Sequence, residues 1–159
     1  MTQPPDDGDT QDLAVLVADI VAEHCPRMRP EAGYTLTNAD AHASFGDGVA
    51  EFEGPTLRWR FTRDKSYLTA DVAARDPGSP GGWDEWVQFL NVLHALGDEA
   101  AVEGLFASGQ RGRRGYRALG RLVDSRHAAV EAAMSPAERA ATLARAAAAQ
   151  AAYVRSLYG

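Results

Sequence analysis

The sequence predicts an α+β fold: an antiparallel β-meander of four or five strands with helices packed on one face. Three observations lead to this fold class. Residues 34–72 contain short runs in which apolar and polar side chains alternate, as they do in half-buried strands. Turn-forming residues separate these runs closely enough to join antiparallel neighbours. The flanking segments instead carry apolar residues at the three- and four-residue spacing of amphipathic helices.

The N-terminal third is expected to hold one helix and the first strands. Residues 1–9 predict a disordered acidic lead-in, and residues 10–159 a single domain, because 159 residues can bury one core comfortably. Thr10 or Asp9 can cap a helix that Pro26 ends. Strands are then expected at 34–37, 41–45 and 49–53, the last two separated by a Gly-Asp-Gly turn at 46–48.

The strongest strand signal is the hairpin at residues 56–72. Trp59 and Phe61 alternate with polar residues, and the alternation resumes at Leu68 after a polar turn. A turn centred on Asp64 and Lys65 would place the apolar side chains of both strands on one face. The expected apolar pairs are Phe61 with Leu68, Trp59 with Ala70 and Leu57 with Val72.

The remainder is expected to be helical between loops. All seven residues at 76–82 favour turns, and they predict a loop. Apolar periodicity predicts helices over 83–96, ended by Gly97, then over 98–106 and 116–133. A glycine- and arginine-rich loop is expected at 108–115. The capping-box sequence that begins at Ser135-Pro136 predicts a final, alanine-rich helix to about residue 157.

Composition and charge exclude several classes of protein. The net charge is −6 with a pI near 5.1, so general affinity for nucleic acid or anionic membranes is not expected. The single cysteine, Cys25, cannot form an intramolecular disulfide and fits a reducing compartment. The N-terminus has no signal-peptide pattern, and no run of about 18 apolar residues could span a membrane. These features predict a cytoplasmic protein.

Catalytic and metal-binding signatures are also missing from the sequence. The four histidines (His24, His42, His94 and His127) are far apart, and neither an HExxH nor a CxxC motif occurs. No nucleophile elbow or phosphate-binding loop is present. We therefore favour a protein that is not an enzyme, and we predict no metal or cofactor. An enzyme would instead require separated polar residues to converge, for example His42, Arg58, Arg60 and Asp71.

Two charged segments are candidate binding surfaces. Residues 1–53 carry eleven acidic and two basic residues, and four of the acidic ones lie on or near the expected strands: Asp40, Asp47, Glu51 and Glu53. Such a surface could attract a basic protein, although acidic residues also serve solubility alone. The second segment is the arginine-rich run, in which Arg111, Arg113, Arg114 and Arg117 are candidate anion-binding residues. An ordinary solvated loop is the alternative.

Several residues carry a partial family resemblance. They are the alternating Leu57, Trp59 and Phe61 followed by Arg63-Asp64, then Trp83, and a Ser135-Pro136 helix ending at Tyr158-Gly159. This arrangement resembles small uncharacterised bacterial proteins, some of which accompany secreted polymorphic toxins as immunity proteins. The resemblance implies a protein of the immunity or antitoxin type. The polarised charge, the exposed polar face of the sheet and the missing catalytic signatures predict a non-enzymatic inhibitor that covers a basic partner with an acidic sheet surface. The alternative is a self-associating structural protein, a homodimer that pairs through residues 136–159.

Overall fold

The computed structural model describes residues 17–42, 47–65, 67–75, 86–107 and 111–159. Residues 17–24 are helical and are followed by two short 3₁₀ turns, η1 (Pro26–Met28) and η2 (Pro30–Ala32). The remaining elements are β1 (Thr35–His42), β2 (Asp47–Glu53), β3 (Leu57–Asp64), β4 (Tyr67–Ala74), β5 (Val87–Gln88), α2 (Phe89–Ala95), α3 (Glu99–Ala107), α4 (Gly112–Ala133) and α5 (Arg139–Tyr158). The acidic lead-in at 1–9 lies outside the described residues.

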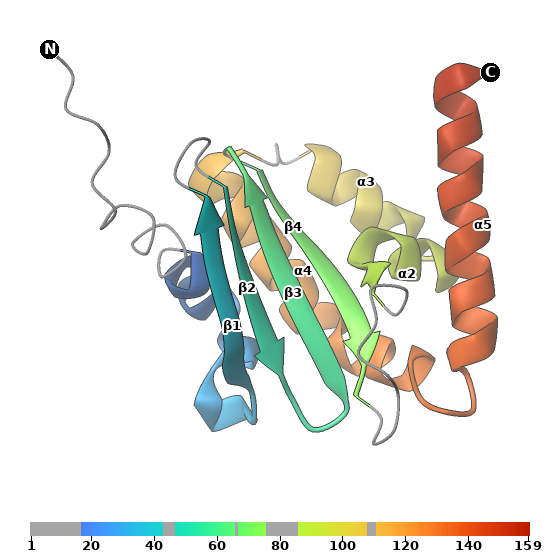
Figure 1. The fold of residues 1–159 in the computed structure, drawn as a ribbon. Helices are drawn as coiled ribbons and strands as arrows, with labels where there is room; N and C mark the ends of the chain where they lie inside the picture. Colours follow the sequence, from blue (N-terminus) through green and yellow to red (C-terminus); the bar gives the residue numbers. More distant parts are fainter. Residues whose placement is uncertain (1–16, 43–46, 66, 76–85, 108–110) are drawn as a thin grey trace, which may run out of the picture.

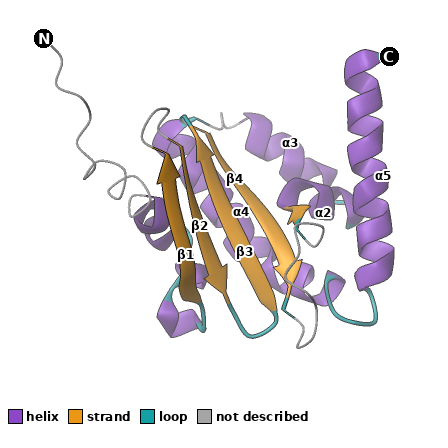
Figure 2. Ribbon diagram, viewed as in Figure 1, coloured by secondary structure: helices purple, strands orange, loops and turns teal. Residues whose placement is uncertain are grey.

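The strands form one antiparallel sheet in the order β1-β2-β3-β4-β5, so each strand pairs with its neighbours in sequence (Figure 2). The predicted fold class, an α+β meander, is confirmed. β1 joins two of the expected strands into one, with an irregularity between Leu36 and Asn38. The final strand, β5, is only two residues long and pairs with Asp71 and Val72 of β4. It therefore leaves most of the β4 edge uncovered by a strand.

The two faces of the sheet differ in what covers them. α4 runs behind the sheet, and Figure 1 shows no described helix over the near face. The covered face is the core face, and its buried side chains alternate with partly buried ones along β3. Trp59 is fully buried and packs against Phe61 and Phe89, with ring centroids 6.3 and 5.3 Å away. We refer to the uncovered side as the open face.

The central hairpin has the predicted faces but a different register. Asp64 pairs with Tyr67, so Phe61 lies opposite Ala70, two residues beyond the predicted Leu68. The connection consists of residues 65 and 66 alone, and Lys65 adopts a positive φ of 58° that such tight connections require. Because the shift is an even number of residues, every side chain keeps its face.

The same shift accounts for a buried arginine at the end of the hairpin. Arg63, predicted to lie in the turn, is instead a strand residue opposite Leu68, on the core face. It is 6% exposed. The prediction failed here because a polar run of Arg, Asp, Lys and Ser is typical of a four-residue turn, whereas the chain closes with two.

The predicted helix at 83–96 begins later than expected. Its described part starts with extended residues, because Gln88 has φ −61° and ψ 131° and pairs with Asp71 of β4. The helix proper, α2, begins at Phe89. Pairing with the sheet edge therefore outweighs the helical periodicity of this segment. Trp83 and the predicted loop at 76–82 lie outside the described residues, and α3 closely matches the predicted helix at 98–106.

The second half of the predicted arginine-rich loop is helical, so that prediction was wrong. Arg111 bridges to Tyr67 on the hairpin, and Gly112 follows with a positive φ of 61° that turns the chain into α4. Arginine is a good helix former, which favours early helix formation once the chain has turned. At the far end, the Ser135 carbonyl accepts backbone bonds from Glu138 and Arg139, so a turn precedes α5 and delays its start to Arg139.

Helix 17–24 ends against the middle of α4. A side-chain carbon added at Gly120 would lie 2.2 Å from the carbonyl oxygen of His24, so only glycine permits this approach. The salt bridge between Arg27 and Asp124, at 3.7 Å, lies next to the same junction. Helix 17–24 and α4, about a hundred residues apart in sequence, thus pack directly against each other over the core. Within the described ranges, no helix combines the length and apolar character needed to cross a membrane.

Candidate functional site

The open face of the sheet carries a compact cluster of charged and aromatic side chains. Arg58 and Arg60 lie two apart on β3, and alternation along the strand directs both away from the core. The ring of Trp86 is 5.2 Å from the Arg58 guanidinium and 4.6 Å from that of Arg60. The Arg60 guanidinium also donates from Nε and Nη2 to one oxygen of Asp71, at 3.2 and 3.0 Å. The guanidinium groups of Arg58 and Arg60 therefore lie on the β4 and β5 side of the open face.

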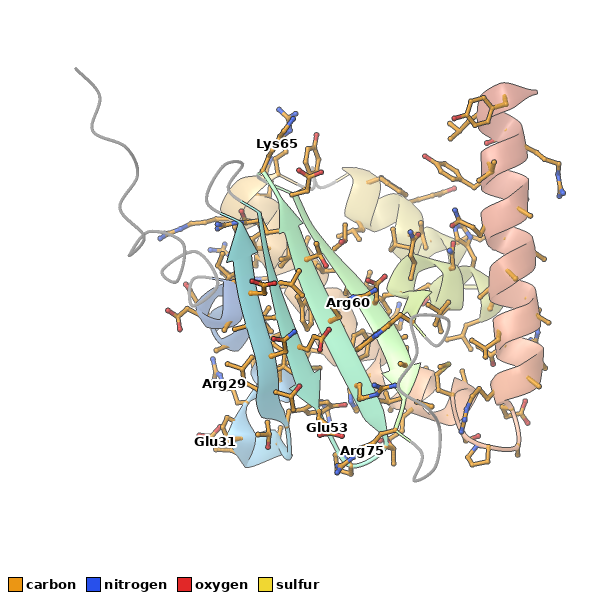
Figure 3. All side chains as sticks on the ribbon, viewed as in Figure 1. Arg29, Glu31, Glu53, Arg60, Lys65 and Arg75 are labelled. Carbon is orange, nitrogen blue, oxygen red and sulfur yellow. The ribbon has the colours of Figure 1, made fainter. Side chains whose placement is uncertain are left out.

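Arg60 leaves its other cross-strand neighbour without an ion pair. Glu51 of β2 is directly opposite Arg60, and Glu53 is opposite Arg58. Among the described residues, no salt bridge reaches the Glu51 carboxylate. Glu53 bonds instead to Arg75 at 2.9 Å, near one end of the sheet (Figure 3). The open face is thus charge-separated, with carboxylates toward β1 and β2 and arginines held toward β4 and β5.

The four predicted acidic residues fall on the two strands at this edge. Asp40 lies on β1 opposite Val49, and its residue is exposed. Asp47 is the first residue of β2 and pairs with His42. Glu51 and Glu53 lie further along β2 and are partly buried. The predicted acidic surface is therefore mixed in charge. Residues 1–53 are acidic, but β3, which pairs with β2, is basic.

Of the four residues suggested for an enzyme pocket, the structure brings three together. Arg58, Arg60 and Asp71 belong to the cluster under Trp86, whereas His42 lies at the far end of the edge strand β1. A cavity of about 270 Å³ opens beside Asp71 at the β4 edge, bounded on the helix side by Phe89, Leu90 and Leu105. Its lining contains no histidine, cysteine or serine, and its only hydroxyl and carboxylate groups among the described residues belong to Thr62, Thr69 and Asp71.

A second group of polar side chains is buried in the core and serves the fold. The Tyr34 hydroxyl and His127 Nε2 are 2.6 Å apart, and the histidine ring stacks on Trp59 at 6.3 Å. Burial raises the pKa of Tyr34 to about 12 and lowers the pKa of His127 below its usual value, so both are neutral near pH 7. One hydrogen bond therefore joins the two neutral groups, and its direction depends on the tautomer of His127.

Cys25 lies near this group and is equally unreactive. It is 1% exposed, and burial, reinforced by the charge of Asp124, raises the pKa of its thiol to about 12. A thiolate is the reactive form, so this cysteine is not a nucleophile in the folded protein. No group of three or more potential metal ligands occurs among the described residues.

The predicted arginine set is divided by the structure. Arg111 turns to the hairpin, where its Nε donates to the Tyr67 hydroxyl at 2.6 Å and its guanidinium covers the Tyr67 ring at 4.9 Å. Arg113, Arg114 and Arg117 are exposed residues of the first turns of α4. Arg121 joins them one turn later. A hollow of about 360 Å³ is lined by Arg114, Arg117, Ala118 and Arg121.

Two features of these sites could not be read from the sequence. Trp86 contacts residues almost thirty positions earlier, and its neighbours in sequence indicated a helix. The Tyr34–His127 bond joins residues 93 apart. Comparison of this chain with known protein families, with curated proteins and with solved structures finds no match.

Proposed function

We propose that this chain is a non-enzymatic protein-binding module, an inhibitor of the immunity type, that binds a basic partner with the β1–β2 half of its open face. The observation that carries the proposal is the uncovered sheet face itself. Helices bury the core face of β3 and β4, whereas residues 35–40 of the edge strand β1 are exposed on both faces. An uncovered edge and face together provide a broad, rigid surface for a partner.

The charge arrangement supports a basic partner. Because Arg60 bonds to Asp71 and stacks under Trp86, the Glu51 carboxylate forms no ion pair among the described residues. A lysine or arginine of a partner could bond there without first breaking an internal salt bridge. Carboxylates placed this way increase the rate and selectivity of association more than its strength. The irregularity in β1 between Leu36 and Asn38 interrupts the edge and limits unspecific strand pairing.

The test uses charge removal with a matched control. We would use the tagged full chain to isolate a partner from the native host and then purify that partner. Its affinity for D40N/E51Q/E53Q would be compared with its affinity for the wild type. Glutamine and asparagine avoid placing a new cation opposite Arg58 and Arg60. The control E99Q/E103Q/E138Q removes the same charge from exposed residues of α3 and the start of α5.

The proposed surface predicts weaker binding by the first variant alone, with a lower association rate and a weaker dependence on salt. Equal losses in both variants would mean that only overall charge matters. Unchanged affinity of D40N/E51Q/E53Q for a partner that the wild type binds would refute the surface.

A second candidate function, self-association, is favoured by α5. The side of α5 that faces α2 includes Ala146 and Gln150, and Gln150 bonds to Asn91 at 2.7 Å. The same stripe continues past α2 with Tyr153, Val154 and Leu157, which are 59%, 42% and 58% exposed. A second copy could bury this projecting end in an isologous pair. Light scattering of wild type and Y153K/L157K tests it, and a monomeric wild type at high concentration would rule it out.

A further inference from the structure

The outward face of α4 carries four arginines for which the described residues provide no counter-charge. Arg113, Arg114, Arg117 and Arg121 are all exposed, and no salt bridge or hydrogen bond links their side chains to the described residues. The protein as a whole is acidic, with a net charge of −6. A local excess of four cations is therefore a feature of this face and not of the composition.

Their placement is unfavourable for the helix itself. Arg113 and Arg117, and again Arg117 and Arg121, are four residues apart, a spacing at which like charges repel. The first three also lie in the opening turns of α4, beside the positive end of the helix dipole. Other arginines of the chain do form ion pairs, as Arg60 does with Asp71 and Arg126 does with Asp98. A repulsive cluster that the fold leaves uncompensated is typical of a ligand-binding surface.

The geometry points to a compact anion. A helix turns 100° and rises 1.5 Å per residue, so Arg114, Arg117 and Arg121 occupy one side of α4 over about 10 Å. They surround the hollow of about 360 Å³ whose remaining lining residue is Ala118, small enough to leave the space open. Guanidinium groups bond phosphate oxygens in a two-pronged geometry. We infer that this hollow, the α4 arginine site, binds a small soluble molecule that carries two or three linked phosphate groups.

Two larger anionic partners fit the site less well. A nucleic acid strand would meet the negative charge of the whole protein, and the hollow has no aromatic side chain on which a base could stack. A membrane surface would require apolar side chains beside the cations, but the only other lining residue is Ala118. A small phosphate chain needs neither feature. The site is on the opposite side of the molecule from the open face, and the inference does not depend on the proposed function.

Sodium tripolyphosphate, titrated into the full chain by calorimetry in low-salt buffer without divalent cations, is the direct probe. We expect saturable binding at one site, and binding of inorganic monophosphate at least tenfold weaker because it can engage fewer arginines. The variant R117Q/R121Q should lose tenfold or more in affinity. The control R145Q/R155Q removes the same charge from exposed residues of α5 and should stay within about twofold.

Stability separates a binding site from a structural role. Without ligand, R117Q/R121Q should melt at the same temperature as wild type or about 1–2 °C higher, since it relieves repulsion. The single variant R121Q, at the end of the cluster, gives a second measurement if the double variant folds poorly. Three results would overturn the inference: no tripolyphosphate binding by wild type, equal weakening in R145Q/R155Q, or tighter binding of a single-stranded RNA or of anionic lipid vesicles than of tripolyphosphate.

Discussion

Replacing Gly120 by alanine tests the close contact between α4 and helix 17–24. Alanine favours a helix interior over glycine by about 1 kcal/mol, so helix propensity alone predicts a more stable protein. The packing predicts the opposite. The new methyl carbon would lie 2.2 Å from the His24 carbonyl oxygen and 2.6 Å from its carbonyl carbon. Both atoms belong to the backbone, so neither can rotate away.

The size of the effect follows from what must move. Ordinary carbon–oxygen contacts need more than 3 Å, so helix 17–24 must retreat by about 1 Å or more from α4. Overpacking of this kind costs about 1–3 kcal/mol. Retreat would also loosen Val17 and Val21, which are fully or almost fully buried, and burial of each contributes roughly 1.5–3 kcal/mol. After the gain in propensity, we expect G120A to lower the free energy of unfolding by about 1–3 kcal/mol.

The chain contains a matched control at Gly104. This residue lies inside α3, and a carbon added there would meet nothing within 4 Å. G104A should therefore raise the free energy of unfolding by up to about 1 kcal/mol. Urea unfolding followed by circular dichroism measures both changes. If G120A proves as stable as wild type, or if the two variants shift in the same direction, the contact between His24 and Gly120 is not as close as described.

Three further predictions concern the buried polar groups. Y34F leaves Nε2 of buried His127 unpaired and should lower the free energy of unfolding by about 1–3 kcal/mol in urea, whereas an unchanged value would argue against the hydrogen bond. The pKa of His127 is lower in the folded protein than in the unfolded chain, so the unfolded chain takes up the proton first as the pH falls. The free energy of unfolding should therefore have its full value above about pH 6.5 and should decline below that pH. H127Q should flatten that decline between pH 7 and 5.5, and an equal slope in both proteins would contradict the assignment. Cys25, with a pKa of about 12, should react with iodoacetamide at pH 8 at least a hundredfold more slowly in native protein than in urea, so rapid native labelling would show that the thiol is accessible.

The sheet was predictable from sequence because its signals are local. Alternation along residues 57–61 and 68–72 determines which side chains face the core, and that remains true in the structure. The register was not predictable to the same degree, since shifts of two residues satisfy the same alternation. Only the positive φ of Lys65 and the pairing of Asp64 with Tyr67 distinguish the two-residue connection from a longer one.

The candidate sites were harder to predict from sequence because they depend on residues that are neighbours in space. Glu51 and Glu53 were identified correctly as strand residues, whereas Asp47, expected in a turn, begins β2, and the placement of Glu51 and Glu53 opposite the arginines of β3 depends on strand pairing. Arg111 and Arg114 look alike in the sequence, yet one covers Tyr67 and the other faces a hollow on α4. A pattern that repeats every few residues reveals the face of an element and not what another element brings to it.

The strand order has a consequence for how this protein acquires its structure during synthesis. Each strand pairs with the one made just before it, so the first four strands can assemble once residue 74 has emerged. The covering of their core face is completed only after α4, at residues 112–133, has been made, because the buried Val123 and Val130 of that helix belong to the same core as Trp59. Until then the core face would be only partly covered on a nascent chain. This interval is when the protein is most exposed to aggregation and when a chaperone would find a binding surface.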